Sequence, residues 1–552
     1  MQKVVTAAEM REIDRLTTER HAVPSLLLME AAADASARAV ASLFPETFPD
    51  LRVLILCGRG NNGGDGAALA RILWTAGAHV EILLFGRADE ACGDARANFE
   101  IARQLASADA ASRLRFLECP DGGAHWQETR ARLAGYDVLV DALFGTGLSR
   151  PLEGIFREAV ASLSAVREAR ASGAPRSFVV SLDVPSGLDA DSAHPIGEAV
   201  RADLTVTFTA PKPANVLPPA SHLNGRLVVA SIGSPASLVA EAPSRLFLTE
   251  ANDARSWLAA TRYAPDSFKN THGHALIFAG SRGMTGAAVL TARAAMRSGA
   301  GLVTVASPAS ALPAVAARVM PEVMTAGLTE TPGGAFSKNA FDEAARLFKR
   351  ADVVAVGPGL TTDEETRTFV RSVVGRRTTP VVIDADGLNC LAPWPAELRG
   401  SGELLLVLTP HLGEMRRLVG AADEINATAD RVALARDFAS AHGLIVVLKG
   451  ARTLVAAPDG RVFVNPTGNP GLGTAGSGDT LTGIITGFIA QSRGIHKDAA
   501  DVLSAVLAAV HVGGAAGDLA AAARGFRSMV ASDITEHLGA AVRALDPEGE
   551  RP

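Results

Sequence analysis

The feature that most constrains the fold is an alternation of short apolar runs with amphipathic helical stretches, which occurs twice along the chain. Strands that alternate with helices in this way are typical of parallel α/β sheets. The apolar runs that we expect to be strands are 51–57, 79–85, 136–144, 177–185 and 202–210 in the first half, and 274–281, 301–308, 351–359, 380–387, 404–411 and 444–450 in the second. Because the two series share no motif, we predict a fusion of two different α/β domains.

The length of 552 residues also supports more than one domain. Residues 232–245 are small, proline-bearing and without strong periodicity, so we place the linker there. The predicted domains are 1–238 and 246–545. A capping box from Thr6 to Glu9 is expected to open the first helix, and the charged tail after Leu545 is expected to fray.

Charge and cysteine usage exclude several classes of function. The formal net charge of −6 gives no electrostatic case for nucleic acid or an anionic membrane as partner. The four cysteines are scattered, so neither a zinc pattern nor a disulfide framework is expected. The N-terminal stretch lacks the apolar core of a signal peptide, and the apolar stretch 502–523 is interrupted by His511, Asp518 and glycines, which predicts a buried helix pair. We expect a cytoplasmic homo-oligomer that acts on small molecules.

A glycine-rich turn, "GRGNNGGDG" at 58–66, lies between the first strand and a helix. Gly58, Gly60 and Gly63 form a GxGxxG pattern, and one interpretation is a Rossmann pyrophosphate site. The turn also carries Asn61, Asn62 and Asp65, however, and an anionic side chain beside a pyrophosphate is repulsive. This polarity favours a different kind of ligand.

Two further strand exits carry oxygen donors that could act with this turn. Asp141 and Asp183 each end a strand, and Ser186 follows the second of them. Because strand exits in an open parallel sheet face one crevice, Asn62, Asp141 and Ser186 could together bind a monovalent or small divalent cation. The alternative is that Asp141 and Asp183 cap the helices or turns that follow.

The stretches "GRGNNGGDG", "DALFGTGLSRP", "DVPSGLDAD" and "FTAPKPANVLPP" resemble the NAD(P)H-hydrate epimerase family, over residues from the first helix to Ile232. The resemblance implies a Rossmann-like fold, a potassium ion held by Asn62, Asp141 and Ser186, and a hydrated nicotinamide substrate. The residues that it implies for substrate contact are Asn61, Asn62, Gly63, Gly64, Asp65, Gly145, Thr146, Gly147, Leu148, Ser149, Arg150, Pro151 and Asp183. From its placement, we expect Asp183 to handle the proton.

In the second half, the stretch "GLGTAGSGDTLTGIITG" places one carboxylate, Asp479, among many glycines. Apolar residues from Leu481 to Ile489 recur with helical spacing, so "TAGSGD" enters a helix N-terminus. Free N–H groups and the helix dipole favour an anion there, and glycines let a phosphate approach the backbone. Asp479 is then placed as the base for an attacking hydroxyl. A purely packing role for Gly476 and Gly478 is the alternative.

Other strand exits of the second half fit a kinase-like site. Lys449 and Gly450 follow one strand, where the backbone could line a nucleotide; a plain surface lysine is the alternative. His411 and Glu414 follow another strand, although a single histidine is more often structural. Gly357 and Gly359 form a second glycine-rich exit. These residues together predict a small-molecule kinase.

The stretches "FAGSRGMTGAAVLTARAAMRSGAGLVTVASP", "VGPGL", "IDADGLN", "LTPHLGEM" and "GNPGLGTAGSGDTLTGIITG" resemble the ADP/ATP-dependent NAD(P)H-hydrate dehydratases, within the ribokinase-like group, over about Leu246 to Leu538. With the first half, the chain resembles the bifunctional NAD(P)H-hydrate repair enzymes. The resemblance implies that the hydrated dinucleotide meets Ala287, Gly359, His411 and Asp479. It implies that the adenine nucleotide meets Lys449, Gly450, Ala451, Arg452, Thr453 and Gly478.

This resemblance suggests why a kinase-like site would perform a dehydration. Hydroxide is a poor leaving group, whereas a phosphorylated oxygen leaves readily. We expect Asp479 to deprotonate the ring hydroxyl as it attacks the terminal phosphate of ADP or ATP, with Mg²⁺ bridging the phosphates. Two alternatives stay open: a vitamin or sugar kinase fused to a regulatory domain, and a first domain that is only a ligand-binding scaffold.

Overall fold

The computed structural model describes residues 1–45, 48–108, 113–120, 123–169, 177–402, 404–420, 430–497 and 500–549. The chain divides into two compact units, Gln2–Ser244 and Arg245–Pro552, with Met1 grouped with the second. The stretch 232–245, predicted as a linker, contains a short helix, α8 (Ala236–Glu241), before the division.

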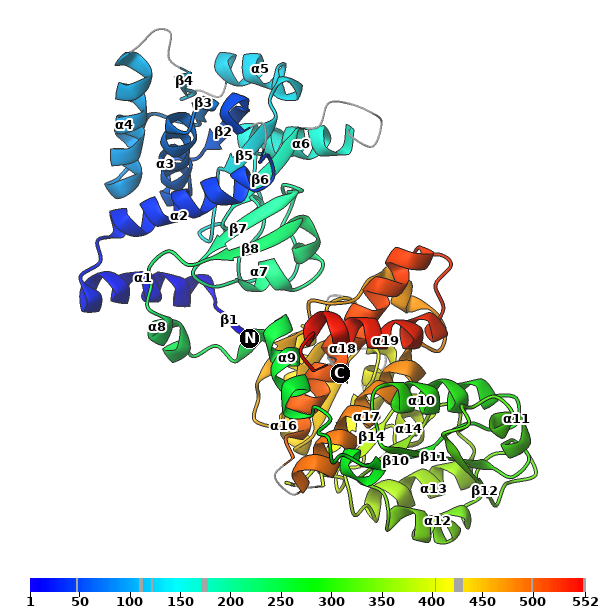
Figure 1. Cartoon of the computed structure of the whole chain (residues 1–552). Coiled ribbons are helices and arrows are strands. Elements are labelled where there is room, and N and C mark those ends of the chain that lie inside the picture. The colour runs from blue at the N-terminus through cyan, green and yellow to red at the C-terminus, as the bar shows by residue number, and fades with distance from the viewer. Residues whose placement is uncertain are drawn as a thin grey trace. The chain divides into compact units, whose positions relative to one another are not determined.

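The N-terminal unit is built on a parallel sheet with the strand order β4-β3-β2-β5-β6-β7-β8 (Figure 1). Its strands are β1 (Gln2–Val4), outside this sheet, β2 (Arg52–Cys57), β3 (His79–Leu84), β4 (Leu114–Glu118), β5 (Val138–Ala142), β6 (Phe178–Leu182), β7 (Leu204–Phe208) and β8 (Arg226–Ala230). The chain order runs outward in both directions from β2 and β5, so the sheet has its topological switch point between these two strands. Ligand sites of open α/β sheets lie at such a point.

Helices cover both faces of this sheet. They are α1 (Ala7–His21), α2 (Ser25–Ala41), α3 (Asn61–Thr75), α4 (Gly93–Ala108), α5 (Ala124–Arg130), α6 (Gly154–Ala169) and α7 (Pro213–Val216), besides α8. On β2, Val53 and Ile55 pack with α2, α3 and α4, whereas Leu54 and Leu56 pack with α5 and α6. The period of two along the strand thus explains two separate apolar cores.

The capping box predicted at the start of α1 is present, because the Thr6 hydroxyl accepts from the Glu9 backbone and the Glu9 carboxylate accepts from the Thr6 N–H. The glycine turn follows β2 as expected. The helix begins earlier than the pattern suggested, however, so Asn61–Asp65 form the first turn of α3 and are not a loop.

The C-terminal unit has a mixed sheet, in the order β9-β18-β17-β16-β15-β14-β13-β10-β11-β12 within this unit. Its strands are β9 (Leu246–Leu248), β10 (His274–Phe278), β11 (Leu302–Pro308), β12 (Met324–Leu328), β13 (Val353–Val356), β14 (Val381–Ile383), β15 (Leu406–Leu408), β16 (Ile445–Leu448), β17 (Leu454–Ala456) and β18 (Val462–Val464). The switch point lies between β10 and β13. We predicted a parallel sheet, but β17 runs antiparallel to both of its neighbours, β16 and β18. A short turn from Ala457 to Arg461 joins β17 to β18, and such a turn can connect only antiparallel strands.

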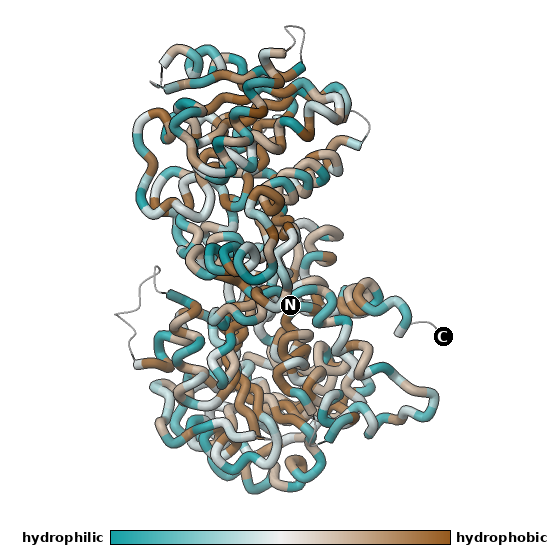
Figure 2. The backbone as a smooth tube through the Cα atoms, turned by 90° about the vertical axis from the view of Figure 1, so that its left-hand side faces the viewer, coloured by the Kyte–Doolittle hydropathy of each residue, from teal (hydrophilic) through white to brown (hydrophobic). Residues whose placement is uncertain are grey.

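The helices of this unit are α9 (Ala251–Ala260), α10 (Thr285–Arg297), α11 (Leu312–Ala316), α12 (Ala340–Phe348), α13 (Glu364–Gly375), α14 (Ala385–Cys390), α15 (Leu412–Val419), α16 (Arg431–His442), α17 (Ser477–His496), α18 (Val502–Arg524) and α19 (Ala531–Leu545). One face of the sheet packs with α9, α10, α17, α18 and α19. On the other face, Phe278 of β10 meets a group of rings that includes Phe348 and Phe369. Figure 2 shows hydrophobic residues concentrated in the interior of each unit.

Two predictions about the C-terminal residues are wrong. The stretch 502–523 is one continuous helix, α18, and not a helix pair, because His511 and the glycines stay within the helical hydrogen-bond ladder. Among the described residues, α18 is the one helix long and apolar enough to cross a membrane, and 72% of its most apolar window is buried inside the protein. The tail is held at its start and does not fray directly after Leu545, since the Asp546 carboxylate accepts a 2.7 Å hydrogen bond from Arg262 Nε; residues 550–552 of the tail lie outside the described residues.

Candidate functional sites

A cavity of about 930 Å³ lies in the N-terminal unit at the carboxyl end of the sheet. It is bordered by α1 and α2, the first turn of α3 and the loops that follow β5, β6 and β7. The predicted contact residues that line it are Asn61, Asn62, Asp65, Gly145, Thr146, Gly147, Leu148, Arg150, Pro151 and Asp183. Predicted residues from the start of α3 and from the loops after β5 and β6 therefore meet in one cavity at the switch point of the sheet.

Three predicted contact residues are not among those that line this cavity: Gly63, Gly64 and Ser149. A Cβ at Gly63 would lie 1.8 Å from the Gly58 carbonyl oxygen, and one at Gly64 would lie 2.7 Å from Ala95 Cα. A Cβ at Gly58 would in turn lie 2.1 Å from the Leu143 carbonyl oxygen. Gly58, Gly63 and Gly64 therefore allow segments of backbone to approach closely, which explains two of the three glycines of the GxGxxG pattern without a pyrophosphate; a Cβ at Gly60 would meet no atom within 4 Å.

Asp141 and Ser186, predicted as cation ligands, lie in direct contact. The buried Asp141 carboxylate accepts hydrogen bonds from Ser186 Oγ at 2.5 Å, Ser186 N at 2.9 Å and Ser181 Oγ at 2.8 Å. Burial raises the pKa of Asp141, and the hydrogen bonds from Ser186 oppose that effect. The Phe144 backbone N–H donates to Ser186 Oγ at 2.9 Å, which ties the loop after β5 to the loop after β6.

Asn62, the third predicted cation ligand, is 8% exposed, and neither of its side-chain polar atoms has a hydrogen-bond partner in the part of the chain that the structure describes. Its side chain lies against Gly145, where a Cβ would be 3.5 Å from Asn62 Oδ1. Gly145 directly follows Phe144, so Asn62 borders the segment that holds Ser186. A buried amide without partners is unfavourable unless a ligand satisfies it.

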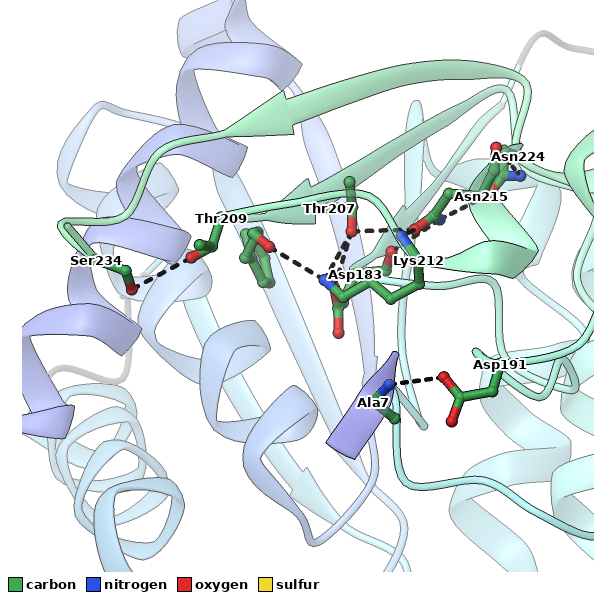
Figure 3. A network of polar contacts seen from close by, with 10 residues as sticks. Ala7, Asp183, Asp191, Thr207, Thr209, Lys212, Asn215, Asn224 and Ser234 are labelled. Atoms are coloured by element: carbon green, nitrogen blue, oxygen red, sulfur yellow. Dashed lines mark hydrogen bonds and ion pairs between the residues drawn. The ribbon is translucent and has the colours of Figure 1, made fainter. Parts of the chain in front are cut away.

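Asp183 stands at the end of β6 in a left-handed backbone conformation, with φ of +63°. Its Oδ1 accepts from Lys212 Nζ at 2.5 Å and from Thr207 Oγ1 at 3.0 Å (Figure 3). Asn215 bonds to both members of the ion pair, because its Oδ1 accepts from the Lys212 backbone N–H and its Nδ2 donates to the Asp183 carbonyl. Asp183 is therefore part of a fixed network and is not simply a cap.

Lys212 is fully buried, and sequence reasoning missed it although it stands in the quoted stretch "FTAPKPANVLPP". The signal was a lysine between two prolines directly after an apolar strand. Asp14 was also missed. Asp14 lies four residues after Met10 and three before Thr17, and both of these residues are buried. This spacing puts the Asp14 carboxylate on the apolar face of α1, which could have indicated a functional residue.

The second candidate site lies at the start of α17 in the C-terminal unit. Gly476 is the N-cap with φ of +84°, a conformation that glycine adopts readily, and Asp479 lies in the first helical turn. The predicted apolar face of this helix is present, with Ile484, Ile485 and Phe488 buried. Burial raises the pKa of Asp479 to about 6; the Asp384 charge adds to the shift and Lys449 opposes it.

Lys449 and Asp384 form an ion pair next to this turn. Lys449 Nζ lies 2.7 Å from Asp384 Oδ1 and 3.9 Å from Glu414 Oε2, and Asp384 Oδ2 accepts from Thr482 Oγ1 at 2.7 Å. Burial alone raises the pKa of Asp384, but the Lys449 ammonium and these hydrogen bonds outweigh it and hold the pKa below its usual value. A plain surface lysine at 449 is excluded. Asp384 was not singled out from "IDADGLN".

The other predicted residues of this half occupy neighbouring strand exits. His411 is the N-cap of α15, where its Nδ1 accepts from the Gly413 N–H at 2.9 Å, so a capping role is present. A Cβ at Gly359 would lie 3.1 Å from the Ala287 side chain, which places those two residues together. A Cβ at Gly478 would lie 3.3 Å from Lys449 Nζ, which joins the predicted nucleotide segment to the helix start.

The segment from Lys449 to Thr453 is held by two arginines. Arg431 Nη1 donates to the Ala451 carbonyl at 2.9 Å, and Arg452 Nη1 donates to the Pro466 carbonyl at 3.1 Å. Burial lowers the pKa of both guanidinium groups. Thr453 Oγ1 donates to the Gly450 carbonyl at 3.2 Å, so the segment turns sharply at its start.

Each half of the chain matches a known protein family. Residues 25–214 match a family described as YjeF-related protein N-terminus, and residues 275–539 match NAD(P)H-hydrate dehydratase. Curated proteins called bifunctional NAD(P)H-hydrate repair enzyme match over almost the whole chain. That of Moorella thermoacetica is 41% identical over 99% of this chain and 98% of its own length, and that of Thermofilum pendens is 38% identical over 99% and 98%.

A solved structure of an ADP/ATP-dependent NAD(P)H-hydrate dehydratase from Bacillus subtilis, co-crystallised with ATP/Mg²⁺, is also similar to this chain. It is 30% identical, covers 54% of this chain and 99% of its own, and superposes with a TM-score of 0.46.

Proposed function

The chain belongs to the family of bifunctional NAD(P)H-hydrate repair enzymes, and we propose that its two units divide this repair between the two sites described above. The chain is an enzyme with an epimerase unit and a nucleotide-dependent dehydratase unit. The observation that supports the division most strongly is the half-buried carboxylate of Asp479 in the first turn of α17, beside the Lys449–Asp384 ion pair.

In the dehydratase unit, Asp479 takes the proton from the ring hydroxyl of the hydrate as its oxygen attacks the terminal phosphate of ADP or ATP. The free N–H groups at the start of α17 hold that phosphate. The ring nitrogen then supplies its lone pair, the phosphorylated oxygen leaves as phosphate, and loss of a proton from the neighbouring ring carbon restores the reduced nicotinamide. The hydrated dinucleotide contacts Ala287, Gly359 and His411, and the adenine nucleotide contacts Lys449–Thr453 and Gly478.

Magnesium fits the donor chemistry of this site, because Mg²⁺ prefers carboxylate and phosphate oxygens and the buried Glu414 faces the Lys449–Asp384 pair. Burial raises the pKa of Glu414, and a divalent cation nearby favours its ionised form. When bound with the nucleotide, the ion neutralises the charge of the phosphates.

Potassium fits the epimerase unit on a separate observation. Asn62 is buried, and neither of its side-chain polar atoms has a partner among the residues that the structure describes. Asp141 is a buried carboxylate that accepts hydrogen bonds from the uncharged groups of Ser181 and Ser186. Asn62, Asp141 and Ser186 supply the hard oxygens that an alkali ion prefers. When bound, the ion would balance the negative charge of the Asp141 carboxylate. It would also order the loops after β5 and β6.

In the epimerase unit, the hydrate lies in the 930 Å³ cavity against the first turn of α3 and the Gly145–Pro151 loop. Asp183 handles a proton of the reaction, held in place by Lys212 and Thr207. The dehydratase uses one epimer, so interconversion of R and S hydrates makes the whole pool repairable.

Two alternatives are less well supported. A vitamin or sugar kinase fused to a regulatory domain, and a first unit that only binds a ligand, both conflict with relatives that match both halves over nearly their full length. Cytoplasmic location and homo-oligomeric assembly stay predictions from the sequence.

The test is recovery of reduced nicotinamide, followed by absorbance, after a mixture of R and S hydrates is added with ADP or ATP and Mg²⁺. Full recovery without accumulation of a phosphorylated product is expected. Recovery of the S share alone would leave a dehydratase without an epimerase, and a stable phosphorylated product would identify a kinase.

A further inference from the structure

Asp14 of α1 lines the same cavity as Asp183, although nothing in the motifs of the epimerase half points to it. It lies on the helix face that carries the buried residues Met10, Ile13 and Thr17. A carboxylate in this position faces the ligand cavity and not bulk solvent, which is unusual for the buried face of a surface helix.

The surroundings of Asp14 disfavour its charge. Its Oδ1 is buried and has no hydrogen-bond partner in the part of the chain that the structure describes. Burial raises the pKa of Asp14 to about 6; Lys212 opposes the shift and Asp183 adds to it. Burial raises the pKa of Asp65, which also lines the cavity, well above its usual value. The other charged residues that line the cavity are Arg11, Arg59, Asp94, Arg150 and Glu153.

Asp183 has the opposite surroundings. Its Oδ1 is in contact with the fully buried Lys212 ammonium at 2.5 Å and with the Thr207 hydroxyl (Figure 3). One cavity thus holds an ion-paired carboxylate and an unpartnered one, and such a pair in different environments is how a site obtains both an acid and a base.

We propose that Asp14 is a second catalytic residue of the epimerase unit and acts as the acid opposite the base Asp183. This inference rests on the epimerase activity proposed above. It names the residue that donates a proton, whereas the motif residues supply only the acceptor, Asp183.

The chemistry follows from the structure of a hydrate. Water adds to a protonated enamine at the carbon bonded to nitrogen, so the hydroxyl of the substrate is on that carbon. Asp14 donates its proton to the hydroxyl oxygen while the C–O bond breaks. Both electrons of that bond leave with the departing water, and the lone pair of the ring nitrogen forms a C=N⁺ bond.

A water molecule then attacks the opposite face of the same carbon. Its oxygen lone pair forms the new C–O bond, the C=N⁺ electron pair returns to nitrogen, and the surplus proton passes to Asp183. Water is released and consumed once, and one proton moves from Asp14 to Asp183. Exchange with solvent returns the pair to its starting state, and the reverse epimerisation uses the same steps in reverse order.

The pH dependence has a definite sign. The reactive enzyme carries one proton on the carboxylate pair, and Asp14 loses that proton as the pH rises through about 6. The rates of R-to-S and of S-to-R conversion should therefore both fall above that pH, by about tenfold per pH unit.

The test is R/S interconversion by the full chain without nucleotide, followed by NMR, so that the dehydratase unit is silent. Asp14→Asn cannot donate a carboxylic proton, and we expect kcat to fall by about 100-fold or more, with the remaining rate independent of pH above 6. Asp14→Glu should recover part of the rate and keep the alkaline decline. In ¹⁸O-labelled water, the wild-type enzyme should place ¹⁸O on the hydroxyl at the rate of interconversion.

The matched control is Glu19→Gln on the same helix, because Glu19 is exposed and pairs with Arg15 at the surface. Nucleotide-dependent dehydration of the S hydrate by each variant reports on the folding of the rest of the chain. Wild-type rates in Asp14→Asn would overturn the proposal. So would a slow variant that keeps the alkaline decline and is not rescued by Asp14→Glu, or an absence of ¹⁸O in the product. If the wild-type enzyme itself does not interconvert the epimers, the proposed epimerase function has failed before any variant is considered.

Discussion

Lys449 Nζ lies 2.7 Å from Asp384 Oδ1, and both groups border the first turn of α17, where a Cβ at Gly478 would come within 3.3 Å of the ammonium. The pair joins the exits of β14 and β16 to the helix that carries Asp479. It also places one negative and one positive charge near Asp479, with opposing effects on the pKa of that carboxyl.

Asp479→Asn should abolish dehydration and leave R/S interconversion unchanged, because only the C-terminal site needs this base. In the wild-type enzyme, kcat for dehydration should fall by about tenfold per unit as the pH drops below about 6, since Asp479 must be ionised to accept the proton. Both activities are measured on the same preparation. Near-wild-type dehydration by the variant would remove Asp479 from the mechanism.

The same substitution should stabilise the protein at neutral pH. The pKa of folded Asp479 is raised from 3.8 to about 6, so its contribution to stability is fully present below the unfolded value and is lost as the pH rises through 6. Asp479→Asn should therefore raise the free energy of unfolding above pH 6, by up to about 3 kcal/mol, and have no effect below pH 4. Urea unfolding across this pH range checks the sign.

Lys449→Met should lower the free energy of unfolding of the C-terminal unit by about 3–5 kcal/mol, because it leaves the Asp384 carboxylate buried without its cation. The matched control is Arg436→Met, which breaks an exposed pair with Asp437 and should change stability by less than about 1 kcal/mol. Equal small effects of the two variants in urea unfolding would contradict a buried ion pair.

Lys212→Met should reduce R/S interconversion and destabilise the N-terminal unit, since the Asp183 carboxylate would lose its ammonium partner and keep the hydrogen bond from Thr207. Arg157→Met, which breaks the exposed pair with Glu198, is the control. Dehydration of pure S hydrate should be unchanged in both. An unimpaired Lys212→Met epimerase would mean that the buried ammonium has no influence on Asp183.

Potassium should raise the melting temperature of the wild-type N-terminal unit relative to tetramethylammonium at equal ionic strength, because a bound ion stabilises the folded state. Asp141→Asn should remove this difference, since it takes away the buried negative charge that attracts the ion. A variant that responds to potassium as the wild type does would exclude Asp141 as a ligand. Sodium and caesium salts test the size of the site.

Local patterns in the sequence were sufficient to predict most of the strands and the helix that carries Asp479. The apolar runs at 51–57 and 274–281 became β2 and β10, and the glycines before Leu481 became the start of α17. These features depend on residues within a few positions of each other. The hairpin of β17 and β18 was missed because its strands are only three residues long.

Lys212, Asp14 and Asp384 show the limit of such patterns. Each is a single charged residue whose role depends on partners from other segments: Lys212 on Asp183, Asp14 on the shared cavity, and Asp384 on Lys449. The sequence alone determined two α/β units, the site motifs and the family, because periodicity, turn chemistry and motif spacing are local properties. Only the tertiary structure decided which charges are buried together and which are left unpartnered, because burial and charge pairing arise when distant strand ends meet at one edge of a sheet.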